Sequence, residues 1–217
     1  MADHTEDHLA DFRARWPEWA FAQPFLAADA RAVAAAWFAL LQVLTDAAWG
    51  GSDPTPGLAK LAWWQEELAG WSRGARRHPL GELLQKRAAP WRELGLALRA
   101  LPATRGRPGE ADDGEAIAVF ADAVARCERA LFAPADAVDG AAADAQADAA
   151  TVAWSLVAEH RLAHPETAAD AVREPPPMHA TRPRRIHLAL QRARRDRRPS
   201  PPLRALWHAW RAARNTP

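Results

Sequence analysis

Several residue types are scarce in this chain of 217 residues, and their scarcity excludes whole classes of structure. Tyrosine is absent, glycine occurs 11 times, and Cys127 is the only cysteine. A single cysteine excludes a disulfide framework and any cysteine-ligated zinc or iron–sulfur site within one chain. The longest uninterrupted apolar run, residues 32–41, is far shorter than the ~20 residues that span a bilayer, so no transmembrane helix is expected. The polar, acidic start has no signal-peptide pattern, so we expect a cytoplasmic protein.

Alanine, by contrast, makes up roughly a quarter of the chain, and tryptophan is frequent, with 11 residues. Alanine favours helices because it loses no side-chain entropy there, and no segment of useful length alternates with the period of a strand. Apolar residues recur at helical spacing between clusters of glycine and proline, which indicates an all-α bundle, with Asp29 as the N-cap of the first helix. The predicted helices cover residues 28–49, 56–72, 80–101, 115–132, 141–163, 183–197 and 201–214.

Charge is distributed unevenly along the chain. Residues 181–217 contain eleven arginines and one acid, Asp196, and carry a net charge of +10. Residues 1–180 contain 17 basic and 26 acidic residues, a net charge of −9. We therefore predict a helical bundle domain over 1–180 and basic C-terminal helices over 181–217 that pack on the same domain. The basic part could also be attracted to an anionic membrane, a protein or, as the least supported alternative, nucleic acid, since no nucleic-acid-binding motif accompanies it.

Four stretches of the chain resemble the squalene/phytoene synthase family. Residues 61–68, Leu-Ala-Trp-Trp-Gln-Glu-Glu-Leu, followed by Gly74 and then His78-Pro79-Leu80, resemble its W-R-x-E-L…G…H-P-V stretch. Residues 31–40 are similar to its R-x-x-x-x-L-Y-A-F helix, and residues 153–161 stand where it has A-x-Q-L-x-N-x-x-R-D. Residues 186–199 resemble its A-x-x-x-L-x-x-A-R helix. The resemblance implies a shortened isoprenoid-synthase-like bundle.

Enzymes of this family are transferases that join two prenyl diphosphates head to head. Two D-x-x-x-D clusters hold Mg²⁺ ions, which neutralise the leaving diphosphate, at the mouth of an apolar chamber between helices. The resemblance therefore implies a role in isoprenoid biosynthesis of the carotenoid or hopanoid type. It also implies a prenyl diphosphate or another isoprenoid lipid as the ligand and, if the chain is an active prenyltransferase, Mg²⁺ as the cofactor.

Both aspartate clusters of the family are degraded in this sequence. Where the first cluster is expected, Asp46 has no acid four residues on, and where the second is expected, Leu162 follows Arg161. A lone carboxylate holds Mg²⁺ poorly, because this ion needs more than one anionic ligand. The chain is thus predicted to be catalytically impaired, with Asp46 as its remaining candidate for catalysis and metal binding.

Other charged residues are candidates for the same chemistry. Asp144 and Asp148 have the spacing of a metal cluster, although acids near a helix start are also favoured by the helix dipole. The substrate-binding candidates, which could meet a diphosphate, are Arg76, Arg77, His78 and Arg161. Glu66 and Glu67 lie opposite a Leu/Trp stripe and are expected on a solvated face or at a cleft.

The positions of the tryptophans and of the last predicted helix decide between a catalytic and a non-catalytic function, and the sequence alone allows both. If tryptophan rings fill the interior, a non-catalytic assembly or partner-binding factor is favoured, whereas an apolar tunnel with carboxylates at one mouth favours an enzyme. The helix over 201–214 mixes Trp207 and Trp210 with arginines. It either packs its tryptophan face on the acidic body or lies on anionic lipid, which would make the chain a peripheral lipid-binding module at the inner face of the membrane.

Overall fold

The computed structural model describes residues 3–105, 114–132, 142–163, 180–194 and 198–214. Within these ranges the chain forms α-helices and two short 3-10 helices and contains no strand, which confirms the predicted all-α fold class. The elements are α1 (Asp3–Arg15), α2 (Trp19–Ala22), η1 (Gln23–Phe25), α3 (Ala28–Trp49), α4 (Thr55–Trp71), α5 (Gly81–Leu84), α6 (Trp91–Ala97), η2 (Leu98–Thr104), α7 (Gly114–Phe132), α8 (Ala142–Ala163), α9 (Arg182–Ala193) and α10 (Pro202–Arg214).

The long helices begin and end close to the positions that the sequence predicts. Helix α3 has the predicted bounds, because the chain is extended at Gly50. Helices α4, α7, α8 and α10 each begin and end within one residue of the prediction. The predicted N-cap of α3 is wrong by two residues: Ala27 is the N-cap, and Asp29 lies in the first turn, where its charge complements the helix dipole.

Two of the predicted helices are wrong in extent, and α1, α2 and η1 lie outside every predicted helix. The segment 80–101 is divided into α5, α6 and η2, because Pro90 has no amide hydrogen to continue a helix and instead caps α6. Helix α9 ends at Ala193 rather than at residue 197, and Arg194 is extended at its C-cap. Helix α1 was missed because its first turns are acidic and carry few apolar residues.

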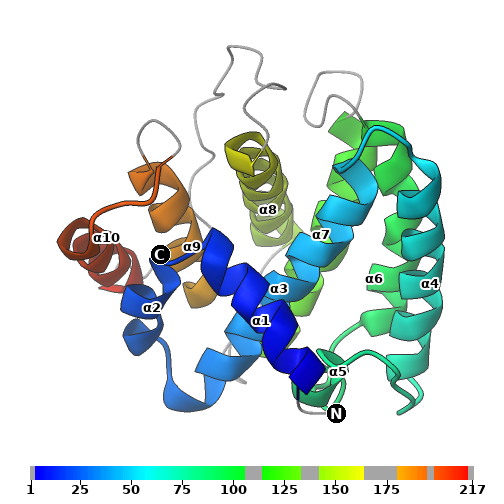
Figure 1. The fold of residues 1–217 in the computed structure, drawn as a ribbon, viewed down its shortest axis with the longest axis horizontal. Coiled ribbons are helices and arrows are strands. Elements are labelled where there is room, and N and C mark those ends of the chain that lie inside the picture. The colour runs from blue at the N-terminus through cyan, green and yellow to red at the C-terminus, as the bar shows by residue number, and fades with distance from the viewer. Residues whose placement is uncertain (1–2, 106–113, 133–141, 164–179, 195–197, 215–217) are drawn as a thin grey trace.

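Helix α3 is the central element around which the other helices pack (Figure 1). Fifteen of its 22 residues are buried, and it contacts α1, α4, α5, α8 and η2. By length and composition α3 could cross a membrane, but most of its apolar window is covered by the rest of the bundle. Helices α4 and α6 lie on one side of α3, whereas α9 and α10 lie on the other, with α10 at the outer edge beside α2 (Figure 1).

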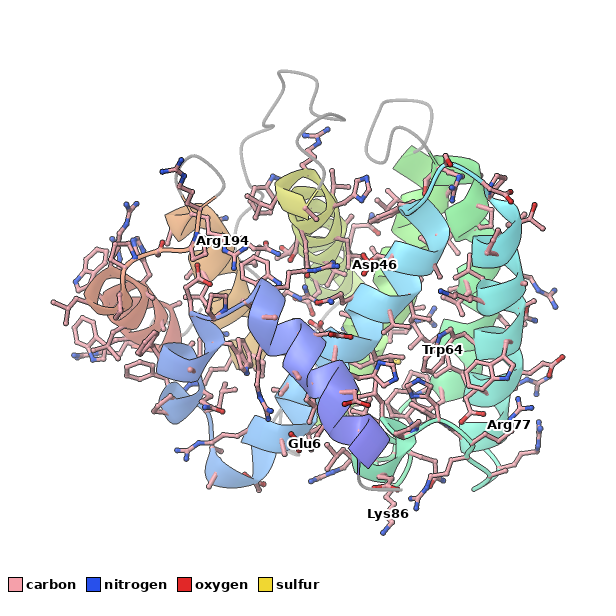
Figure 2. All side chains as sticks on the ribbon, viewed as in Figure 1. Glu6, Asp46, Trp64, Arg77, Lys86 and Arg194 are labelled. Atoms are coloured by element: carbon pink, nitrogen blue, oxygen red, sulfur yellow. The ribbon has the colours of Figure 1, made fainter. Side chains whose placement is uncertain are left out.

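Tryptophan side chains fill much of the interior between α3, α4 and α6. Trp37 packs against Trp91, Trp91 against Trp71, and Trp71 against Trp64, with ring centroids 5.2–6.2 Å apart. We call these four residues the tryptophan row. Figure 2 shows Trp64 pointing from α4 toward the interior. Their indole hydrogens are used as well: Trp37 and Trp71 each donate to a buried glutamate.

The only cysteine lies in the same interior. Cys127 on α7 is fully buried, and its Sγ is 3.8 Å from the carbonyl oxygen of Pro90. Burial, together with the neighbouring Glu128, raises the pKa of the Cys127 thiol far above its ordinary value. The sulfur is therefore a small apolar group of the core, as its helical position predicts.

We predict that the close crossing of α3 and α4 depends on Gly57. A Cβ at this position would lie 2.1 Å from the carbonyl oxygen of Ala47, so Gly57→Ala should lower the free energy of unfolding by about 1–3 kcal/mol. Gly70→Ala in the same helix is the control, because its Cβ would meet nothing closer than 3.4 Å and alanine favours a helix. Urea denaturation measures both, and equal stability of the two variants would contradict the close crossing.

Candidate functional site

Asp46, the first metal-binding and catalytic candidate, is paired with an arginine. Arg15, in the last turn of α1, donates from Nη1 to Oδ1 over 3.0 Å and from Nη2 to Oδ2 over 2.8 Å. Both carboxylate oxygens of Asp46 are thus occupied by one guanidinium, which joins the C-terminal end of α1 to the last turns of α3. A metal ion at Asp46 would have to displace Arg15.

The second pair of metal-binding candidates lies on α8. Asp148 is paired with Arg129 of α7, whose Nε is 3.7 Å from Oδ2, and Asp144 belongs to the first turn of α8 with a side chain outside the described residues. In the part of the chain that the structure describes, no three His, Cys, Asp or Glu side chains come together as a metal ion would need. A magnesium site therefore remains a prediction from the resemblance.

Residues 74–79, which we call the basic turn, follow α4 and are held against that helix by hydrogen bonds to Glu67. Oε1 of Glu67 accepts hydrogen bonds from the backbone amides of Arg77 (2.6 Å) and His78 (2.8 Å) and from Nε1 of Trp71 (2.8 Å), while Nε of Arg77 donates to Oε2 (3.0 Å). Burial opposes ionisation of Glu67, but these donors outweigh it and lower the pKa of the carboxyl below its ordinary value. The alternative in which Glu67 shares a solvated face with Glu66 is wrong, because Glu66 is exposed and Glu67 is buried. The alternative of a cleft is confirmed, because both glutamates line a surface hollow of about 500 Å³.

The structure gathers three of the four substrate-binding candidates at one surface hollow of about 540 Å³. Arg76, Arg77 and His78 line it, whereas Arg161 lies in the last turn of α8. The remaining lining residues are Asp7, His8, Asp11, Pro79 and Glu82. Three carboxylates among them oppose the binding of a diphosphate.

His78 adds no positive charge to this hollow at neutral pH. Burial and the neighbouring His8 lower the pKa of His78 to about 4. Its ring centroid is 4.6 Å from that of His8 and 4.4 Å from that of Trp64, and its Nδ1 accepts the amide hydrogen of Leu80. Arg77, for its part, is held by Glu67 and lies over the ring of Trp63. These contacts explain the Trp-Trp…His-Pro-Leu pattern as the packing of a turn.

A buried ion pair lies between α7 and α9, where the sequence had given no candidate. Arg184 is completely buried, and its Nε donates to Oε1 and Oε2 of Glu128 over 3.0 and 3.2 Å, while Nη2 also contacts Oε1. Nε1 of Trp37 donates to the same Oε1 over 2.8 Å. Nη1 of Arg184 reaches Oγ of Ser155 on α8 over 2.9 Å. One ion pair thereby joins four helices.

Polar groups continue from this ion pair toward α1. Ser155 donates to Oε1 of Gln191 over 3.1 Å, and the Gln191 amide nitrogen is 3.3 Å from Nδ1 of His187. His187 Nε2 has no hydrogen-bond partner in the described structure and lies 4.0 Å from Oε2 of Glu159. Glu159 in turn accepts Nε1 of Trp16 over 3.0 Å. We call the buried polar residues Glu128, Arg184, Ser155, Gln191, His187 and Glu159 the charged core.

Burial disfavours charge at the far end of the charged core. It lowers the pKa of His187 well below its ordinary value, an effect that the positive charges of Arg184 and Arg194 strengthen. Burial also raises the pKa of Glu159, in spite of the hydrogen bond from Trp16. The His187 ring is stacked on Phe38, with ring centroids 4.4 Å apart. Aromatic rings thus cover the end of the charged core at His187 and Glu159.

A second carboxylate fastens the basic end of the chain to the body. Nε and Nη2 of Arg194 donate to the two oxygens of Glu18 over 3.0 and 2.8 Å, and the Ser200 amide donates to Oε1 over 2.8 Å. Burial opposes ionisation of Glu18, but these hydrogen bonds lower the pKa of Glu18 below its ordinary value. The guanidinium carbon of Arg194 lies 3.7 Å from the ring centroid of Trp16 (Figure 2). Part of the basic region therefore binds the chain's own acidic body.

Helix α10 packs on the body through its alanine face, and its tryptophan face is exposed. Its buried residues are Ala205, Ala209 and Ala212, which face α9 and α2. Trp207 and Trp210 are 49% and 43% exposed. The alternative in which the tryptophan face packs on the body is wrong, because the small alanine side chains allow a closer approach of the helix.

Comparisons with protein-family models, with curated proteins and with solved structures found no match. The similarity to squalene/phytoene synthases therefore rests on the sequence stretches given above and stays a prediction. Among the residues that form these contacts, the sequence singles out Asp46, Glu66, Glu67, Arg77, His78 and Asp148, but neither partner of the Glu128–Arg184 ion pair. The charged core could have been found from α9, because Arg184, His187 and Gln191 recur at helical spacing as a polar stripe.

We predict that the ion pair of the charged core supports the fold as a pair. Arg184→Met leaves Glu128 buried without a counter-charge and should lower the free energy of unfolding by about 3–5 kcal/mol. The double variant Glu128→Gln/Arg184→Met should lose less than this single variant, because no unpaired charge remains. Urea denaturation measures both. The control is Arg182→Met at the exposed start of α9, which should stay within about 0.5 kcal/mol of the wild type.

Loss of the Glu67 carboxylate should free the basic turn. Glu67→Gln replaces a charged acceptor of four hydrogen bonds, so we expect a loss of about 1.5–3 kcal/mol in unfolding free energy at neutral pH, against little change for the exposed Glu66→Gln. Because the pKa of Glu67 is lowered on folding, its contribution is complete above the ordinary value of 4.5 and is lost as the pH falls through the folded-state value. The difference between wild type and Glu67→Gln should therefore shrink on acidification, and a constant difference would contradict the role of the charge.

Proposed function

We propose that this chain is a non-catalytic protein built like a squalene/phytoene synthase, which acts in isoprenoid metabolism as an assembly or partner-binding factor. It would bind through its surface rather than transform a substrate in its interior. The observation that carries this proposal is the filling of the interior by the tryptophan row and the charged core.

A prenyl-coupling reaction needs space that these groups occupy. Two long isoprenoid chains and a carbocation require an apolar chamber from which water is excluded. Between α3, α4 and α6 the indoles of the tryptophan row, which meet in tilted and edge-to-face contacts, take up this space. Between α7, α8 and α9 a salt bridge with its hydrogen-bond partners lies instead of apolar side chains. Opening either region would leave buried polar groups without partners, which costs several kcal/mol.

The acids of the predicted metal site support the same proposal. Asp46 and Asp148 are each within 4 Å of an arginine nitrogen, and a guanidinium neutralises the carboxylate charge that would attract Mg²⁺. Mg²⁺ binds weakly to single carboxylates and depends on phosphate oxygens and further anionic ligands. In the active enzyme that the resemblance implies, Asp46 would have to exchange Arg15 for the metal ion.

Incubation with farnesyl or geranylgeranyl diphosphate and Mg²⁺ tests the proposal. We expect no release of diphosphate above the rate in buffer, either from the wild type or from Arg15→Ala, in which Asp46 has no counter-ion. An active synthase assayed in parallel shows that the conditions are adequate. Release of diphosphate by the wild type that disappears in Asp46→Asn would overturn the proposal and identify the chain as an active prenyltransferase.

Binding of a prenyl chain in the interior has a separate readout. The tryptophan row makes indole fluorescence sensitive to a ligand between α3, α4 and α6. A non-hydrolysable farnesyl thiodiphosphate should therefore give no saturable quenching in the presence of Mg²⁺. Saturable quenching that is lost with EDTA would show an open, metal-dependent chamber and contradict the filled interior.

A further inference from the structure

The exposed side of α10 is not used by the fold or by the charged core. It consists of Leu203, Leu206, Trp207, Trp210, Arg211 and Arg214, which we call the α10 outer face. We infer that this face is an interfacial membrane anchor that docks the protein on anionic lipid. The inference rests on the proposed function, because it names the surface to which a protein that acts by binding is held.

The spacing of residues separates α10 into an inner and an outer side. The buried alanines at 205, 209 and 212 recur at helical spacing and lie against the body. Leu203, Leu206, Trp207 and Trp210 recur at the same spacing on the opposite side, where 41–82% of each side chain is exposed. Helix α10 lies at the outer edge of the molecule (Figure 1), and the exposure of these four side chains places the apolar strip on the side away from the bundle. Four large apolar side chains in one exposed strip are unusual for a surface that meets only water.

Two arginines lie over the exposed indole rings. The guanidinium carbon of Arg211 is 5.4 Å from the ring centroid of Trp207, and that of Arg214 is 4.8 Å from the ring centroid of Trp210. No carboxylate among the described residues forms an ion pair with Arg211 or Arg214. Their donors therefore remain available for phosphate oxygens, while the indoles beside them suit the boundary between headgroups and acyl chains.

The chemistry of the face favours lipid over a second copy of the chain. Two copies that met through this face would bring Arg211 and Arg214 against the same cations, which repel each other. An anionic lipid surface attracts them instead, and an amphipathic helix with tryptophan, leucine and arginine inserts its apolar side at the headgroup level.

The uneven distribution of charge determines which side of the molecule faces an anionic membrane. Residues 1–180 carry −9 and residues 181–217 carry +10, so the chain has an acidic body and a basic end even though Arg184 and Arg194 are paired with Glu128 and Glu18 of the body. An anionic surface attracts the end that carries α10 and repels the body. The body would then stand away from the membrane, with the acidic side of the hollow at Asp7, Asp11 and Glu82 open to solution.

Flotation of the full chain with vesicles tests the inference. The wild type should float with phosphatidylcholine vesicles that contain phosphatidylglycerol, should stay in solution with pure phosphatidylcholine, and should dissociate as salt is added. Trp207→Ser/Trp210→Ser and, separately, Arg211→Glu/Arg214→Glu should each lower the partition coefficient about tenfold or more. Bromine-labelled acyl chains should quench the wild-type fluorescence, and this quenching should be lost in the tryptophan double variant.

Each variant has a matched control elsewhere on the surface. Leu58→Ser/Leu96→Ser removes two large apolar side chains that are each 46% exposed, and Arg87→Glu/Arg92→Glu changes the net charge by the same amount as the α10 variant. Both controls should float like the wild type. Equal losses in the controls, or a wild type that stays in solution with the anionic vesicles, would overturn the inference.

Two further outcomes distinguish the competing interpretations. Wild-type dimers in solution that dissociate in the tryptophan double variant, without flotation of either, would assign the face to a second copy and overturn lipid docking. Flotation that fails while diphosphate release is also absent overturns this inference and leaves the proposed function standing. Diphosphate release from a chain that still floats overturns the proposed function and leaves the membrane anchor standing.

Discussion

The salt bridge between Glu128 and Arg184 is the interaction on which the arrangement of the bundle depends. It brings a formal negative and a formal positive charge into a region without solvent, and such charges are tolerated only when every donor and acceptor is satisfied. Trp37 on α3 and Ser155 on α8 supply the remaining hydrogen bonds, so four helices are placed by one set of polar contacts. Apolar packing alone would allow these helices to slide, whereas the geometry of a guanidinium and a carboxylate does not.

The helices themselves could be predicted from the sequence, but their packing partners could not. Periodic apolar residues and flanking glycine and proline located α3, α4, α7, α8 and α10 to within a residue. These signals are local, and they fail where a local signal is ambiguous, as at Pro90, or weak, as in the acidic α1. Glu67 shows the limit most clearly: by periodicity it resembles its exposed neighbour Glu66, and only the return of the chain at residues 77–78 provides the amides that bury it.

For the candidate site too, single residues could be predicted from the sequence, but their partners could not. The sequence identified Asp46 as a lone carboxylate, and the loss of its partner acid is visible without coordinates. That Arg15 would neutralise it depends on the crossing of α1 over α3, between residues 31 positions apart. The charged core pairs residues up to 56 positions apart, and its Glu159 accepts a hydrogen bond from Trp16, 143 positions away. Long-range pairs of this kind leave only an indirect trace in one sequence, such as a polar stripe on a helix that is otherwise buried.

The position of Cys127 has a consequence for the conditions under which the fold can exist. Its thiol is enclosed by α7 and its neighbours, and a raised pKa keeps it protonated, so it offers no thiolate to oxidants, metals or other disulfides. The single thiol of the folded chain is therefore shielded from oxidation and disulfide exchange. A thiol introduced at any exposed position would be its sole reactive sulfur, which makes the native protein a ready host for a single spectroscopic label without prior removal of cysteines.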